Sequence, residues 1–156
     1  MDQQLIERVR EEIKLLAKEI GGVGADGDRI KIGKVSIAGL DYLGVLIENL
    51  SVNPERFAKV KSVRALLLLP REYPRLPPLG LYVNRDLKVT TRHFVKKGVH
   101  GAPDLVRQGL YWFCHGIGGF DDDQRQALWR PASNPQDGDN LCTVVAAARV
   151  QMNSKH

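Results

Sequence analysis

Residues 66–78 read LLLLPREYPRLPP, and this stretch decides the fold that we expect for the chain. The largely apolar run from Val63 to Leu69 is typical of a strand buried on both faces of a sheet. The prolines of the following step, Tyr73-Pro74-Arg75-Leu76-Pro77-Pro78, end that strand because proline cannot donate to a strand ladder. Candidates for the neighbouring strands lie before and after this stretch.

Three further strand candidates lie at residues 29–37, 42–50 and 79–83, and the last of them is expected to form an edge strand. Helical patterns flank this antiparallel set at both ends of the chain, which indicates an α+β layout. We therefore predict a single α+β domain over residues 1–156. It should contain an N-terminal helix, a four-stranded antiparallel meander, a long loop and a C-terminal helix.

The two predicted helices are read from apolar residues that recur at steps of three and four. Residues 3–20 form the first, with Asp2 as a candidate N-cap and Gly21-Gly22 after its end. Asp139 is the candidate cap of the C-terminal helix. The apolar stripe of that second helix consists of Leu141, Val144, Val145, Ala148 and Met152.

Three basic residues recur every four positions on the polar side of the first helix: Arg10, Lys14 and Lys18. Like charges at this spacing mildly destabilise an isolated helix. Two interpretations therefore stay open. The three side chains form either an ordinary solvated face or a docking face for an acidic partner.

Composition narrows the class of protein. With 156 residues, 43% hydrophobic and 26% charged, the chain has the values of one globular domain. Its longest apolar stretch, Ala65–Leu69, is too short to span a bilayer, and residues 1–4 do not begin a secretory signal, so we expect a cytoplasmic protein and no membrane partner. The net charge of +5 comes from scattered basic residues without an aromatic stripe, which argues against a nucleic-acid partner.

Cys114 is the candidate nucleophile. It follows the apolar run Gly109–Phe113 and precedes a glycine-rich segment, which would leave room for a large substrate. An inert structural cysteine, a thiol hydrolase and a zinc site with His93, His100 and His115 are the alternatives, and the spacing fits no common zinc pattern. Cys142, in the first turn of the last helix, is expected to be a small buried filler.

At these residues the chain resembles the ubiquitin-conjugating enzymes. Residues 66–78 match the third strand and the Tyr-Pro-x-x-Pro-Pro step of that family, and Trp129-Arg130-Pro131 matches its Trp-x-Pro segment. Gly109–Cys114 takes the place of the short strand that delivers the active-site cysteine in a long loop. The resemblance spans most of the chain, although only the proline step and the Trp-x-Pro segment are specific.

The chain departs from the family pattern near the cysteine. The usual His-Pro-Asn tripeptide, whose asparagine supports the transfer step, is absent. His115 is the first candidate to replace that asparagine and His100 the second. The longer spacings around Cys114 are similar to those of divergent bacterial members found in ubiquitin-like conjugation operons, some of them linked to antiphage defence.

The resemblance implies an enzyme that needs neither a metal nor an organic cofactor. Cys114 would accept a ubiquitin-like modifier from an activating enzyme as a thioester. It would then transfer the modifier to an amine, by default a lysine, on a target protein. The first helix contributes to docking the activating enzyme in this family, which assigns that role to Arg10, Lys14 and Lys18. The alternative is a catalytically inactive module of the same fold that binds a modifier or partner.

Overall fold

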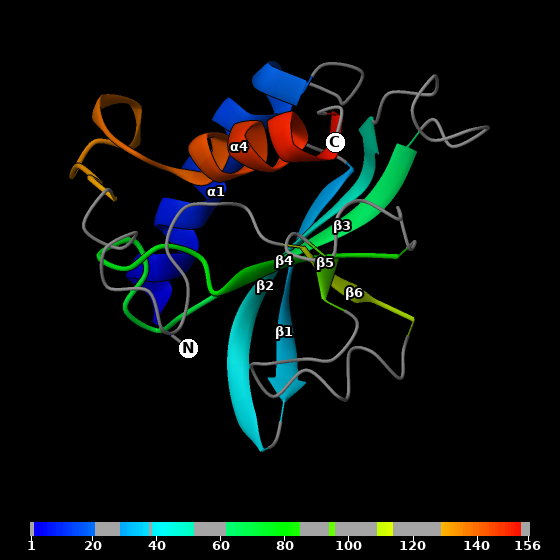
Figure 1. Cartoon of the computed structure of the whole chain (residues 1–156). Coiled ribbons are helices and arrows are strands. Elements are labelled where there is room, and N and C mark those ends of the chain that lie inside the picture. Colours follow the sequence, from blue (N-terminus) through cyan, green and yellow to red (C-terminus); the bar gives the residue numbers. More distant parts are fainter. Residues whose placement is uncertain are drawn as a thin grey trace.

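The computed structural model describes residues 2–20, 29–37, 39–51, 62–84, 94–95, 109–113 and 129–153. Helices α1 and α4 lie on the same face of an antiparallel sheet (Figure 1). The elements in chain order are α1 (Gln3–Ile20), β1 (Ile30–Ile37), β2 (Leu40–Ser51), β3 (Ser62–Leu69), β4 (Gly80–Val83), β5 (Phe94–Val95), β6 (Tyr111–Phe113), η1 (Pro135–Asp137) and α4 (Leu141–Asn153). This arrangement confirms the predicted α+β class, the four-stranded meander and the two helices. No described helix has both the length and the apolar character that crossing a membrane requires.

The sheet is wider than the predicted meander. Its strand order is β1-β2-β3-β4-β6-β5, and all the pairs are antiparallel. The prediction that residues 79–83 form an edge strand is wrong, because β6 pairs with β4 and places Phe113 opposite Leu81. The physical reason is burial. All four residues of β4 are buried, and buried main-chain N–H and C=O groups need hydrogen-bond partners, which a strand on each side provides.

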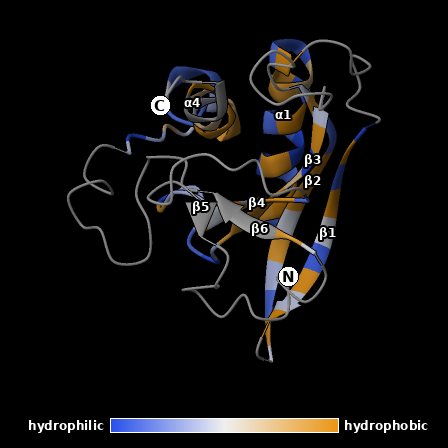
Figure 2. Ribbon diagram, turned by 45° about the vertical axis from the view of Figure 1, so that its right-hand side comes forward, coloured by the Kyte–Doolittle hydropathy of each residue, from blue (hydrophilic) through white to orange (hydrophobic). Residues whose placement is uncertain are grey.

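The central strand β3 is buried on both faces, as its sequence predicted. Leu67 and Leu69 belong to the core that the sheet forms with α1 and α4. Leu66 and Leu68 point the other way and pack with Tyr82 in a second apolar cluster. In Figure 2 the ribbon is orange along much of β3 and on parts of both helices, which marks their apolar residues.

Helix α1 begins where the sequence predicted. The Gln4 amide donates to Asp2 Oδ1 at 2.9 Å, so Asp2 is the N-cap. Leu5, Val9 and Leu16 face the sheet and are buried. Capping and the apolar stripe together fix both the start of the helix and its rotation against the sheet.

Helix α4 begins at Leu141, but its predicted cap is wrong. Asn140 caps it, since its Oδ1 accepts from the Cys142 amide at 2.7 Å. Instead, the Asp139 carboxylate accepts from the Arg130 amide at 2.7 Å, and the Asp139 amide donates to the Arg130 carbonyl at 2.8 Å. Asp139 therefore closes the loop before the helix, and the residue adjacent to the first helical turn takes the capping position.

Candidate functional site

The two sequence motifs behind the family resemblance meet in space. The rings of Tyr73 and Trp129 lie 6.3 Å apart between centroids, tilted by 45°. The Trp129 indole Nε1 donates to the Pro74 carbonyl at 2.7 Å, and Trp129 is buried. The peptide bond between Tyr73 and Pro74 is cis. Trp129 and the start of the segment that follows it are held against the proline step after β3.

A buried carboxylate joins this contact to both helices. Glu12 of α1 is completely buried, and its Oε1 accepts from the Tyr73 hydroxyl and from the Leu141 amide, the latter at 2.8 Å. Its Oε2 accepts from Arg8 Nε at 2.7 Å. Burial and the adjacent Glu12 carboxylate raise the pKa of Tyr73, which keeps its hydroxyl protonated as a donor. Glu12 therefore holds α1, the proline step and α4 together.

Arg8 extends this connection to the segment after Trp129. Its Nη1 donates to the Ala132 carbonyl at 2.5 Å and to the Ser133 carbonyl at 3.0 Å. Gly138 keeps the same segment compact, because a Cβ there would lie 2.7 Å from both Ala132 N and Arg130 O. The Trp-x-Pro corner, residues 129–140, is thus fixed by α1 on one side and by its own close packing on the other.

The sequence interpretation missed the role of Glu12. One signal was available: Glu12 stands three residues after Val9 and four before Leu16, within the apolar stripe of α1. A carboxylate at such a position is buried and requires hydrogen-bond donors from other elements.

Strand β6 ends at Phe113, one residue before Cys114. Phe113 is paired with Leu81 of β4 on one side and with Phe94 of β5 on the other. The prediction that Gly109–Phe113 leads into Cys114 as a strand is confirmed for Tyr111–Phe113. Cys114 itself, His115 and His100 lie outside the described residues, and so does His93 of the alternative zinc site. Within the described ranges, no group of three potential metal ligands comes together.

Cys142 occupies the place that the sequence assigned to it. It is half-buried and packs against the larger core. Burial, then the carboxylates of Glu19 and Glu12, raises the pKa of its thiol to about 11. Since the thiolate is the reactive form, Cys142 is a poor nucleophile at neutral pH.

The pKa of Cys142 gives a testable pH dependence. In Cys114→Ala, Cys142 is the remaining cysteine, and at pH 8 only about one thiol in a thousand should be ionised, given a pKa of about 11. We expect labelling by iodoacetamide to be slow at pH 8 and to rise about tenfold per pH unit up to about pH 10. Mass spectrometry of timed samples measures this rate. A rate that levels off below pH 9 would contradict the raised pKa.

The basic residues predicted on α1 share one exposed side of that helix. Arg10, Lys14 and Lys18 are exposed, and none of them takes part in the ion pairs found among the described residues. A shallow hollow of about 340 Å³ separates Lys14 and Lys18 from η1, and another of about 370 Å³ separates Arg10 and Lys14 from β1. The sequence interpretation placed these cations together correctly, but it did not foresee the hollows beside them.

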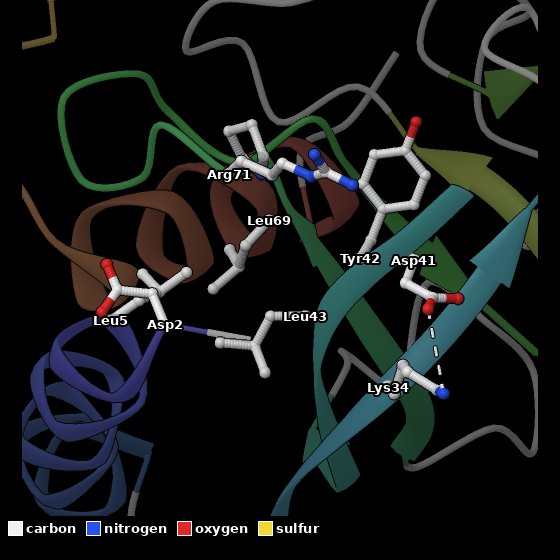
Figure 3. A pocket seen from close by; sticks show the side chains of 9 residues that line it. Asp2, Leu5, Lys34, Asp41, Tyr42, Leu43, Leu69 and Arg71 are labelled. Atoms are coloured by element: carbon white, nitrogen blue, oxygen red, sulfur yellow. Dashed lines mark ion pairs between the residues drawn. The ribbon is translucent and has the colours of Figure 1, made fainter.

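A further hollow, of about 690 Å³, opens between the start of α1, the β1–β2 hairpin and Arg71 (Figure 3). Its charges are mixed, because Lys34 Nζ lies 3.8 Å from Asp41 Oδ2. The Ser36 hydroxyl donates to Asp41 Oδ1 at 2.5 Å, and this bond, together with Lys34, lowers the pKa of the Asp41 carboxyl. Asp41 therefore stays ionised and offsets the nearby cations.

Comparisons with models of known protein families, with curated proteins and with solved structures find no match. The interpretation of this site therefore depends on the geometry and chemistry of the chain itself.

Proposed function

We propose that this chain is a ubiquitin-conjugating-like enzyme that carries a ubiquitin-like modifier as a thioester on Cys114. The packing of the Tyr73–Pro74 step on Trp129 is the observation that carries the proposal. In the chain, Cys114 lies between β6 and Trp129. Both ends of its segment are thus attached to the same domain, through β4 and through the proline step. Such anchoring suits a nucleophile that must be presented to large protein substrates.

The proposed chemistry has two balanced steps. The Cys114 thiolate attacks the modifier's C-terminal thioester on the activating enzyme, so a new carbon–sulfur bond forms while the old one breaks and releases the enzyme's thiolate. A lysine amine of the target then attacks the same carbonyl carbon. A carbon–nitrogen bond forms, the bond to Cys114 breaks, and the amine loses a proton to a base. Neither step needs a metal or an organic cofactor, and in a bacterial cytoplasm the pathway could serve antiphage defence.

The direct test is a loading reaction. The chain is mixed with ATP, its activating enzyme and the ubiquitin-like modifier. The products of the genes beside its own are the first candidates for these two proteins. We expect an adduct that thiol reductants cleave. A chain that binds the modifier but forms no adduct would instead be the inactive binding module.

The basic side of α1 should control the rate of loading. Reversing Arg10, Lys14 and Lys18 to glutamate should slow loading at low salt by about tenfold, because attraction between exposed charges raises association rates. Salt should also slow the variant less than the wild type, since such attraction is screened over about 8–10 Å at ordinary ionic strength. Stopped loading reactions at two salt concentrations measure both effects.

The matched control is a triple variant in which Glu7, Glu11 and Glu19, also exposed on α1, become lysine. It should retain or increase the loading rate. Equal loading by wild type and both variants at low salt would leave Arg10, Lys14 and Lys18 as solvated surface.

His115 is the first candidate base for the second step. If it accepts the amine proton, His115→Ala should slow discharge of the loaded thioester to free lysine by about 10²-fold, while loading is retained. Single-turnover discharge after quenching ATP measures this. Normal discharge in His115→Ala combined with slow discharge in His100→Ala would transfer the role to His100.

A further inference from the structure

Among the strands that the structure describes, β1 forms one edge of the sheet, and half of its main-chain groups face outward. Two observations show which residues of β1 bond to β2 and which face outward. They are the register of β1 with β2 and the 3.1 Å hydrogen bond from the Glu48 amide to the Arg29 carbonyl. The main-chain N–H and C=O groups of every second residue from Arg29, namely residues 31, 33, 35 and 37, therefore point towards β2. The amides and carbonyls of residues 30, 32, 34 and 36 therefore point to the open side. This row is about 20 Å long, which is enough to pair with a peptide of six or seven residues.

A groove runs between this open edge and helix α1. Ile30 and Ile32 of β1 and Ile13 of α1 form its apolar floor, and Arg10 and Lys14 border it from above. Its volume is about 370 Å³. In Figure 2, β1 lies at the outer side of the sheet. We call this surface, Arg10, Ile13, Lys14, Ile30 and Ile32, the edge groove.

On the opposite face of β1, Gly33 has no side chain to cover the edge. Gly33 is exposed, and a Cβ placed on it would have no atom within 4 Å. Glycine at such a position in an edge strand allows another main chain to approach closely. Together with the groove on the helix side, this leaves room for one added strand.

The charges around the edge select the chemistry of that strand. Lys31 and Lys34 project from β1 itself, and their ammonium groups lie 3.4 Å and 3.8 Å from the carboxylates of Glu48 and Asp41 on β2. Arg10 and Lys14 border the groove from α1. Lysines on an edge strand oppose pairing with a second copy of the same edge, because like charges would then face each other. Arg10 and Lys14, which take part in none of the ion pairs found within the described ranges, attract a strand that carries carboxylates.

We propose that the edge groove binds an extended, acidic and apolar segment of a partner protein as an added strand beside β1. Main-chain hydrogen bonds to residues 30, 32, 34 and 36 provide the pairing. Apolar side chains of the segment pack on Ile13 and Ile32, and its carboxylates face Arg10 and Lys14. This binding mode involves no chemistry at Cys114, although it shares Arg10 and Lys14 with the side of α1 that we propose for loading.

Two synthetic peptides test the proposal without any other protein. One alternates glutamate and valine over ten residues, and the other alternates lysine and valine. Each carries fluorescein, and anisotropy follows its binding to the full chain. We expect the acidic peptide to bind at least about tenfold more tightly. Equal binding, or no saturable binding of the acidic peptide up to about 1 mM, would overturn the proposal.

Substitutions at Lys34 separate strand addition from simple attraction. Lys34→Pro removes one outward amide and leaves the bonds between β1 and β2 in place, whereas Lys34→Ala removes the charge but keeps that amide. Lys34→Pro should weaken binding about tenfold relative to Lys34→Ala, because a main-chain hydrogen bond is lost and its acceptor is left unpaired. Equal affinity of the two variants would overturn strand addition.

A measurement on the unaltered chain keeps the test independent of folding in the variants. The acidic peptide should slow hydrogen exchange at the outward amides of Ile32, Lys34 and Ser36. Protection confined to α1 would overturn the proposal in favour of a helix-docked partner. Sedimentation provides the last criterion: a dimer that Lys34→Pro dissociates would assign the edge to a second copy and overturn the proposal as well.

Discussion

We expect Cys114→Ala to lose the thioester adduct completely, while Cys142→Ala forms it at the rate of the wild type. A thioester needs a sulfur atom at the attacking position, and alanine has none. Cys142 cannot substitute, because it is half-buried and its pKa is raised to about 11, which leaves very little thiolate at pH 7.5. Gel electrophoresis with and without reductant measures both results.

Two further variants identify the bond. Cys114→Ser should give an ester and Cys114→Lys an amide, and both adducts should resist thiol reductants if the modifier reaches this position. An adduct that persists in Cys114→Ala would assign the acceptor to another residue. No adduct in the wild type, with active partners, would favour the inactive binding module instead.

Among the variants tested for stability, Glu12→Ala should show the largest loss in the free energy of unfolding. Glu12→Ala leaves Arg8 Nε, the Tyr73 hydroxyl and the Leu141 amide without their acceptor, although Arg8 Nη1 keeps the Ala132 and Ser133 carbonyls. Breaking a buried charged pair by deleting one partner typically costs about 3–5 kcal/mol, because the remaining charge stays buried without compensation. We expect a loss of this size in the free energy of unfolding, measured by urea titration.

Graded controls separate the network from general effects of substitution on α1. Glu11→Ala, at the exposed neighbouring position, should change stability by less than about 0.5 kcal/mol. Tyr73→Phe removes one donor and should cost about 1–2 kcal/mol, since Glu12 keeps its other two partners. A loss below about 1 kcal/mol in Glu12→Ala would mean that the buried network contributes little net stability.

The parts of the fold that follow from local patterns could be predicted from the sequence. The stripe of α1, its Asp2 cap and the two-sided burial of β3 each depend on residues close together in the chain. The position of β4 inside the sheet could not be read in this way. It depends on pairing with β6, which lies almost thirty residues further along the chain, and neither strand's own pattern specifies that partner.

In the candidate site too, the features that depend on local patterns could be predicted, and those that depend on contacts between distant residues could not. Cys114 could be selected because the strand before it and the motifs on either side are local features. Glu12 was missed because its donors come from Tyr73 and Leu141, which are distant in sequence and close only after folding. The cap of α4 was misplaced by one residue, since Asp139 and Asn140 are both good caps and the contact with Arg130 decides between them.

The Glu12 network also has a consequence for the order of events during protein synthesis. Helix α1 leaves the ribosome before α4, yet one donor to Glu12 is the amide of Leu141, 129 residues later. At about 5–20 residues per second, roughly 6–26 s pass before that donor exists. Until then Glu12 lacks one of its donors, which disfavours its burial. Helix α4 therefore completes the environment of α1, and the native core should close only after α4 has been synthesised.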